Sequence, residues 1–455
     1  MPYIPHTQQD REQMLATIGV ERLDQLLDAV PESHRYPELD LGPALSEPEV
    51  LRLMLQLSER NRDVDHTPSF MGAGAYNHYI PAAVSRITGR SEFYTAYTPY
   101  QPEISQGTLQ ATYEFQTMVA SLMGMDVANA SMYDGATAAA EGALLAVHYT
   151  RRKKVLVSAS FHPEWLRVLR TFTSGMGLEI QTVGDETSPW KLTPEQARAA
   201  LDEQTACLLV QYPNFFGGIE DVQGFADAAH DAGALLVVST YPIALGLLKS
   251  PGELGADVAV GEGQSLGTDL DFGGPYLGLF ATRDKYVRYM PGRLVGATKD
   301  LEGTRGYVLT LQTREQHIRR EKATSNICTN EALNALAATV YLSLMGKQGL
   351  PQVAKLCLNN AHYLASGIQQ LQGWEVLTPT PYFNEFLVSC PVPASEVLTR
   401  LLQENLLAGV DIARFLPEHA DKLLVCATEM NTRSEMDQYL KVLNGIALPE
   451  AAAVS

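Results

Sequence analysis

The chain has 455 residues, of which 45% are hydrophobic and 19% are charged. This composition is that of an ordinary folded protein, and the length indicates about two or three domains. The net charge of −18 argues against a nucleic-acid binder and against a protein that docks on an anionic membrane.

The cysteines give no sign of a metal site or a disulfide framework, because they lie far apart without a C-x-x-C pair. They are Cys207, Cys328, Cys357, Cys390 and Cys426. No apolar run reaches the length of a membrane span, and the N-terminus lacks the apolar core of a signal peptide. We therefore expect a cytoplasmic protein without a bound metal or a membrane anchor.

Residues 1–105 are predicted to form an N-terminal segment of helices and irregular chain. Ser46 and Glu49 are typical of a capping box, and an apolar stripe with helical spacing follows them. Residues 68–107 are rich in Tyr, Gly and Pro and show no clear period. Long irregular segments in a compact protein tend to be functional, although packing between domains would explain any single tyrosine at least as well.

Residues 106–330 are predicted to form a central α/β domain, because short apolar strands alternate there with amphipathic helices. The predicted strands are 127–133, 154–160, 178–183, 206–213, 234–240 and 257–261. Crossover helices between such strands predict a mostly parallel sheet covered on both faces. Ligands of such sheets bind at the carboxyl ends of the strands, so the strand-to-helix turns are candidate sites.

Residues 331–455 are predicted to form a smaller α+β domain at the C-terminus. Helices are expected over 331–348 and 350–371, followed by short strands at 375–379, 384–390 and 422–429. The polar run from Glu321 to Asn330 precedes the first of these helices. Its residues Thr324, Ser325 and Asn326 have the chemistry to bind a carboxylate, and capping of the helix is the other interpretation.

The first strand-to-helix turn of the central domain is a candidate anion site. Gly135, Ala136 and Thr137 would begin a helix whose free N–H groups, together with the Thr137 hydroxyl, can hold an anion. Asp134 and Thr137 are also typical of a helix cap, and the Asp134 carboxylate would repel a phosphate. Both interpretations fit the residues.

The stretch from Gly255 to Asp284 resembles the lysine loop of fold-type-I pyridoxal-phosphate (PLP) enzymes, in which a strand, a Gly-rich turn and a return strand follow one another. Gln264 and Ser265 stand where such a loop would carry His-Lys. The loop therefore lacks the amine that would hold PLP covalently. We expect that this chain alone cannot bind the cofactor in that way.

Two further turns can be compared with the same enzymes. His162 follows the strand at 154–160, where these enzymes often place a ring that stacks on PLP, although a histidine before a proline is more often a cap or a surface residue. After the strand at 234–240 they place an aspartate that keeps the pyridine nitrogen protonated. Here Ser239, Thr240, Tyr241 and Pro242 offer no carboxylate.

Longer stretches resemble one family over almost the whole chain, the P-proteins of the glycine cleavage system and in particular their N-terminal-half members. They are residues 72–84, 97–142, 261–267, 271–284, 291–298, 305–320 and 321–333. The resemblance implies a fold-type-I PLP-transferase-like fold and a subunit of a glycine-decarboxylating oxidoreductase in glycine catabolism.

In such split P-proteins, the resemblance further implies a heterotetramer of two plus two homologous subunits. The second subunit carries PLP on its own lysine, and the enzyme passes the aminomethyl group of glycine to the lipoyl group of H-protein. No catalytic residue is then expected in this chain, and Thr137 and His162 are at most vestigial cofactor contacts. Tyr97, Tyr100, Thr324, Ser325 and Asn326 are candidates for the substrate channel or the subunit interface.

Two other functions stay compatible with parts of the sequence. One is a self-sufficient PLP enzyme, such as an aminotransferase or a desulfurase-like protein, which the lysine-free loop disfavours. The other is a non-catalytic regulatory pseudoenzyme built on the same fold.

Overall fold

The computed structural model describes residues 5–446 except 186, 328–329 and 379–380, so Cys328 lies outside the described residues. The chain divides into two compact units, Met1–Arg62 and Asp63–Ser455. The predicted domain boundaries at 105/106 and 330/331 stay predictions.

The first unit contains two α-helices, α1 (Gln8–Ile18) and α2 (Glu47–Ser58). The predicted capping box of α2 is confirmed, because the Ser46 N–H and hydroxyl both donate to the Glu49 carboxylate, at 2.7 and 2.6 Å. None of residues 5–62 is buried, so this described part of the unit has no hydrophobic core of its own.

The second unit is built on a seven-stranded sheet with the order β1-β7-β6-β5-β4-β2-β3. The neighbouring strands β3, β2, β4, β5 and β6 run parallel, whereas β7 pairs antiparallel with β6 and β1. The prediction of a mostly parallel sheet is therefore confirmed. The strands are β1 (Val127–Ala128), β2 (Lys154–Ser158), β3 (Glu179–Val183), β4 (Thr205–Tyr212), β5 (Leu235–Thr240), β6 (Val258–Glu262) and β7 (Gly278–Thr282).

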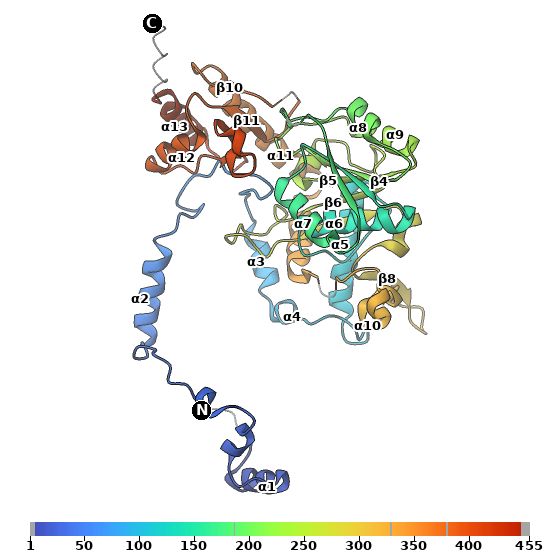
Figure 1. Ribbon diagram of the computed structural model, residues 1–455, viewed down its shortest axis with the longest axis vertical. Helices are drawn as coiled ribbons and strands as arrows, with labels where there is room; N and C mark the ends of the chain where they lie inside the picture. The colour runs from blue at the N-terminus through green and yellow to red at the C-terminus, as the bar shows by residue number, and fades with distance from the viewer. Residues whose placement is uncertain (1–4, 186, 328–329, 379–380, 447–455) are drawn as a thin grey trace. The chain divides into compact units, whose positions relative to one another are not determined.

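Helices cover both faces of this sheet (Figure 1). Successive strand residues alternate between two cores, so that Val237 packs with residues of α6 and Val238 packs with residues of α5 and α9. A side chain at Gly142 would press on Val237, which explains a glycine where α6 crosses the sheet. The main helices are α5 (Gln106–Met123), α6 (Gly135–Thr150), α7 (Pro163–Thr173), α8 (Pro194–Ala200), α9 (Val222–Asp231) and α11 (Ala332–Gln369).

A two-stranded hairpin beside α5 was not predicted from the sequence. It consists of β8 (Leu294–Lys299) and β9 (Arg305–Thr310), and the Gln116 side chain holds both the N–H and the C=O of Val295. The shorter helices of this unit are α3 (Ala82–Thr88), α4 (Ser91–Tyr94) and α10 (Gln316–Arg319).

The C-terminal part holds an antiparallel sheet with the order β10-β11-β13-β12 (Figure 1, red). Helix α11 reaches it after a break at Gly346 (φ 56°, ψ −163°), which agrees with the two helices predicted there. No helix in the described part of the chain has the length and the apolar character of a membrane span. The remaining elements are β10 (Glu375–Val376), β11 (Glu385–Ser389), α12 (Ala394–Gln403), β12 (Val410–Asp411), β13 (Lys422–Cys426) and α13 (Arg433–Asn444).

Candidate functional site

A cleft of about 410 Å³ lies where the crevice rule predicts it, beside the carboxyl end of β6 and the N-terminal ends of α6 and α7. We call it the acidic cleft, because four carboxylates line it and none of its described lining residues is Lys, Arg or His. The carboxylates belong to Asp134, Glu164, Glu262 and Glu331, and the other lining residues include Tyr133, Trp165 and Tyr276.

Two of the free N–H groups at the start of α6, those of Gly135 and Thr137, are taken by carboxylates of the same chain. Gly135 donates its N–H to Glu262 at 2.9 Å, and the other oxygen of Glu262 accepts the N–H groups of Gln264 and Leu277 at 3.1 and 3.0 Å. Burial raises the pKa of Glu262 to about 8, although these three N–H groups favour its ionised form. Glu262 therefore occupies the position that an external anion would take.

Thr137 and Asp134 form a closed capping box at the same helix end. The Thr137 N–H donates to the Asp134 carboxylate at 2.7 Å, while the Thr137 hydroxyl lies 3.2 Å from the Asp134 N–H and 3.0 Å from its carbonyl. The structure thus shows the capping arrangement. The N–H and the hydroxyl of Thr137, which would have to bind an anion, are both bonded within the turn.

His162 is buried and stacks on a neighbouring ring of its own chain. Its imidazole lies 5.2 Å from the Trp165 ring at an interplanar angle of 11°. Nε2 contacts the Ala73 carbonyl at 2.9 Å, and Nδ1 accepts the Glu164 N–H at 3.2 Å as a helix cap. Burial lowers the pKa of His162 to about 4, so the ring is neutral.

The loop after β6 is held by its own side chains. Gln264 accepts the N–H of Tyr76 at 3.0 Å and donates to the Thr268 carbonyl at 2.8 Å. The Ser265 hydroxyl is buried without a hydrogen-bond partner among the described residues. At the end of β5, the Tyr241 hydroxyl is hydrogen-bonded to His78, and the Tyr241 ring packs against that of Tyr76 at 4.3 Å with an interplanar angle of 35°.

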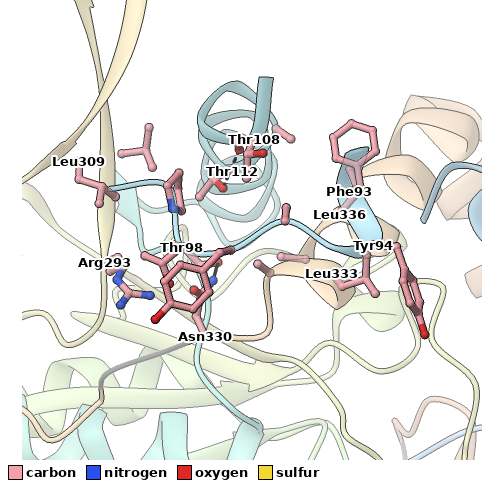
Figure 2. Close-up of a pocket in the computed structure, with 18 residues that line it drawn as sticks. Phe93, Tyr94, Thr98, Thr108, Thr112, Arg293, Leu309, Asn330, Leu333 and Leu336 are labelled. Atoms are coloured by element: carbon pink, nitrogen blue, oxygen red, sulfur yellow. Dashed lines mark hydrogen bonds between the residues drawn. The ribbon is translucent and has the colours of Figure 1, made fainter. Parts of the chain in front are cut away.

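A second cavity, of about 210 Å³, is lined by the tyrosine-rich segment, and we call it the Tyr97 pocket. Figure 2 shows Arg293, Thr98 and Asn330 toward one end, and Phe93 and Tyr94 at the other. Its walls are otherwise mostly apolar and include Val295, Leu309, Leu333 and Leu336. The pocket thus combines an apolar body with one buried cation.

Arg293 is fixed by residues around the Tyr97 pocket. It donates to the Tyr100 hydroxyl at 2.9 Å, and its Nε lies 3.7 Å from the Glu315 carboxylate without a hydrogen-bond partner in the described chain. Tyr97 is 82% exposed, whereas the Arg293 residue is only 5% exposed. Tyr97 therefore lines this pocket, whereas Tyr100 does not line it and is connected to it through its bond to Arg293.

Thr324, Ser325 and Asn326 do not cap α11, so the capping interpretation of these three residues is wrong. Helix α11 begins at Ala332, and the Glu331 N–H is accepted by Ser131 at 3.0 Å. The Ser325 hydroxyl instead donates to the buried Glu141 carboxylate of α6 at 2.7 Å. The N–H of Thr324 and the carbonyl of Asn326 are bonded to Arg314 and Gln316.

The fold defines the class of the protein, since it is that of fold-type-I PLP-dependent enzymes. A solved glutamate decarboxylase from Lactobacillus brevis shares it at a TM-score of 0.67 and 12% identity, covering 92% of this chain and 96% of that one. Within this class, a family model described as "Glycine cleavage system P-protein" matches residues 1–443, and the chain belongs to that family.

Two relatives agree with this family. "Probable glycine dehydrogenase (decarboxylating) subunit 1" of Thermomicrobium roseum is 57% identical over 445 residues, which are 97% of this chain and 99% of the relative. A crystal structure of glycine decarboxylase (P-protein) of the glycine cleavage system, in inhibitor-bound form, is 43% identical. Its TM-score is 0.89, and the match covers 98% of this chain and 100% of that one. The predicted fold class and family are confirmed.

The fold family implies PLP, but the residues of the acidic cleft do not fit it. The anion position at Gly135 is occupied by Glu262, and a Cβ at Gly135 would already lie 2.3 Å from Trp165. One face of the His162 ring is covered by Trp165, and neither a lysine at Ser265 nor a carboxylate at residues 239–242 is present. The carboxylates of Asp134 and Glu164 would also repel a phosphate placed there.

Sequence reasoning found the missing lysine and acid but missed the residues that close the site. Glu262 lies 127 residues from its partner Gly135, so no local spacing connects them. Arg293 carried no motif, and only its position before an apolar pair at the unpredicted hairpin would have drawn attention to it.

Proposed function

We propose that this chain is the PLP-free subunit of a two-chain glycine dehydrogenase (decarboxylating) in the cytoplasm. A second subunit would hold PLP covalently, in a heterotetramer of two plus two. The enzyme decarboxylates glycine and transfers the aminomethyl group to the lipoyl group of H-protein. PLP supplies the electron sink for that chemistry when it is bound, and this chain shapes the surface around the reacting groups.

The observation that carries the proposal is the closed cofactor position. In this chain Glu262 occupies the anion position, Trp165 covers a face of His162, and Ser265 stands in place of the lysine. Nearly the whole chain nevertheless matches the family model. The name "subunit 1" of the relative from Thermomicrobium roseum supports a second chain. A fold that is retained without its own cofactor site is explained if it serves a partner's site.

The Tyr97 pocket is our candidate for the channel that guides glycine and the lipoyl arm. An apolar wall suits the hydrocarbon part of a lipoyl group, and the exposed Tyr97 ring lies at the pocket. The exposed Asn326 and its neighbours Thr324 and Ser325 are proposed to support the subunit interface.

The central experiment compares the chain alone with the chain co-purified with its second subunit. We expect the chain alone to show no PLP absorbance and no reduction-trapped cofactor, and the pair to contain PLP and decarboxylate glycine. PLP trapped by borohydride on the isolated chain would instead support the self-sufficient enzyme. Full activity of the second subunit alone would support the regulatory pseudoenzyme.

A residue-level test uses the two tyrosines. We predict that Tyr97→Ala or Tyr100→Ala slows glycine decarboxylation by the reconstituted pair about tenfold without lowering its PLP content, because substrate positioning is lost. Tyr149→Ala is the matched control, since this tyrosine is 41% exposed and lies outside the pocket. Unchanged kinetics of both variants would remove these tyrosines from the channel.

A further inference from the structure

A cluster of metal-ligand side chains lies away from both cavities. It consists of His78, Cys357 and Glu429. His78 belongs to the irregular segment before α3, Cys357 to α11, and Glu429 to the turn after β13. His78 is 6% exposed and Cys357 is fully buried, so the cluster ties three distant segments together inside the protein.

The donor atoms of these side chains are close enough to share one ion. His78 Nδ1 and Cys357 Sγ lie 2.8 and 3.2 Å from the same oxygen of Glu429, and all three donors lie within 4.8 Å of one another. Zinc bonds of about 2.0–2.3 Å in tetrahedral geometry separate such donors by roughly 3.3–3.7 Å. The two pairs that include Glu429 would open by less than about 1 Å, and His78 Nδ1 and Cys357 Sγ, up to 4.8 Å apart, would approach each other by about 1 Å to share a common centre.

Hydrogen bonds from neighbouring residues also orient these side chains, as is usual for metal ligands. The remaining ring nitrogen of His78, Nε2, is bonded to the Tyr241 hydroxyl. The other oxygen of Glu429 accepts the Tyr79 N–H at 2.8 Å. Both contacts fix the side chains while leaving the three donor atoms facing one another.

One hydroxyl beside the cluster lacks a partner. Tyr341 is 0% exposed, and its hydroxyl has no hydrogen-bond partner among the described residues. Its burial, and then the charges of Glu429 and Cys357, raise the pKa of this hydroxyl. A buried hydroxyl without a bond is costly, and a water held by an ion in this cluster would satisfy it.

We propose that His78 Nδ1, Cys357 Sγ and the Glu429 carboxylate bind one Zn²⁺, with a water bonded to Tyr341 in the fourth position. A neutral imidazole, a thiolate and a carboxylate balance the charge of the ion, so a neutral complex is buried. Binding releases the thiol proton of Cys357 to solvent. The prediction of no bound metal was based on local cysteine spacing, which cannot detect ligands from three segments.

The ion would act as a structural cross-link. It joins the segment around His78, helix α11 and the C-terminal sheet, all of which pack near the end of β5. Because a ligand that binds only the folded state stabilises it, zinc should raise the thermal stability of the full chain. This role does not depend on the proposed glycine dehydrogenase activity.

Metal content of the full-length chain tests the site directly. After removal of metal with EDTA and reconstitution with Zn²⁺, we expect about one zinc per chain by elemental analysis. Cys357→Ser and His78→Asn should bind less than about a fifth of that amount, whereas Cys390→Ser, a buried cysteine outside the cluster, should keep it. Co²⁺ should give a thiolate charge-transfer band in the wild type and in Cys390→Ser only.

The wild-type protein alone suffices to overturn the proposal, so misfolding of a variant does not protect it. Less than about 0.1 zinc per chain after reconstitution would show that the three side chains are only a hydrogen-bonded network. A Co²⁺ band that persists in folded Cys357→Ser would place the metal elsewhere. A zinc-dependent rise in Tm of at least about 3 °C is expected in the wild type and should disappear in that variant.

Discussion

The acidic cleft and the Tyr97 pocket are lined by neighbouring residues of two chain segments but have opposite chemistry. Asp134 and Glu331 line the acidic cleft, whereas Ala130 and Asn330, a few residues away, line the Tyr97 pocket. The cleft occupies the cofactor position of the fold and is lined by four carboxylates. The pocket is mostly apolar and faces a single buried arginine.

Under the function that we propose, one fold has lost a chemical role and kept a spatial one. In the cleft, self-supplied groups have replaced the ligand at each anchoring point, as Glu262 does at Gly135. In the Tyr97 pocket, the Nε of Arg293 has no hydrogen-bond partner among the described residues. Buried polar atoms usually find partners, so an unpaired one beside a cavity points to a missing ligand or neighbour.

The largest effect is expected from filling the Tyr97 pocket. Leu333→Trp places a large ring in a cavity of about 210 Å³. We predict a roughly 100-fold lower kcat/KM for lipoylated H-protein in the reconstituted pair, because small displacements of a substrate are that costly. Steady-state kinetics with PLP content measured in parallel would check it.

Leu344→Trp is the matched control for that variant. Leu344 lies on the same helix, is 52% exposed and does not line the pocket. It should leave the kinetics within about twofold of the wild type, since surface substitutions are usually tolerated. Equal rates for the two tryptophan variants would mean that the pocket has no part in the reaction, and the contrast between the two cavities would lose its functional meaning.

The acidic cleft is expected to respond in stability. In Gly135→Ala the new methyl group would lie 2.3 Å from Trp165 and 3.0 Å from Glu262. We predict a loss of about 1–3 kcal/mol in the free energy of unfolding, because overpacking forces neighbours to shift. Urea unfolding of the isolated chain would measure it.

Gly175→Ala is the control for this effect, because nothing lies within 4 Å of a Cβ at that position. It should change the free energy of unfolding by less than about 0.5 kcal/mol. If Gly135→Ala is equally mild, Trp165 does not pack firmly over the start of α6, and the cleft is more open than its geometry indicates.

Much of the fold was predictable because local sequence patterns determine its helices and strands. Helix α6 begins at the predicted residue Gly135, since Asp134 caps its start and an alanine-rich run follows. The β8–β9 hairpin was missed because its strands carry few alternating apolar residues. Strand β12 has only two residues, too few for any period to appear.

The site was predictable only where a residue is absent. The missing lysine at Ser265 and the missing acid among residues 239–242 are visible in the sequence, because the resemblance to fold-type-I PLP enzymes gives their places. The side chains that replace them are not visible. Glu262 meets Gly135 across 127 residues and His78 meets Glu429 across 351, and such contacts arise from topology and not from spacing.

The smallest effect is expected at Glu141, whose buried carboxylate accepts a hydrogen bond from Ser325. Burial raises the pKa of Glu141 to about 7, from an ordinary value near 4.5. The folded protein therefore binds a proton that the unfolded chain has lost between these two pH values. The stability from this proton is complete below about pH 4.5 and is lost as the pH rises through 7.

Glu141→Gln keeps an acceptor for Ser325 but cannot ionise. We predict that the wild type loses roughly 1 kcal/mol more of its unfolding free energy than this variant between pH 5.5 and 8.5. Burial also raises the pKa of Glu220, Glu262 and Glu385, so both proteins should become less stable over this range. The exposed Glu203→Gln should retain the wild-type slope. If Glu141→Gln retains that slope as well, Glu141 is ionised in the folded protein. Its hydrogen bond with Ser325 then involves a charged carboxylate.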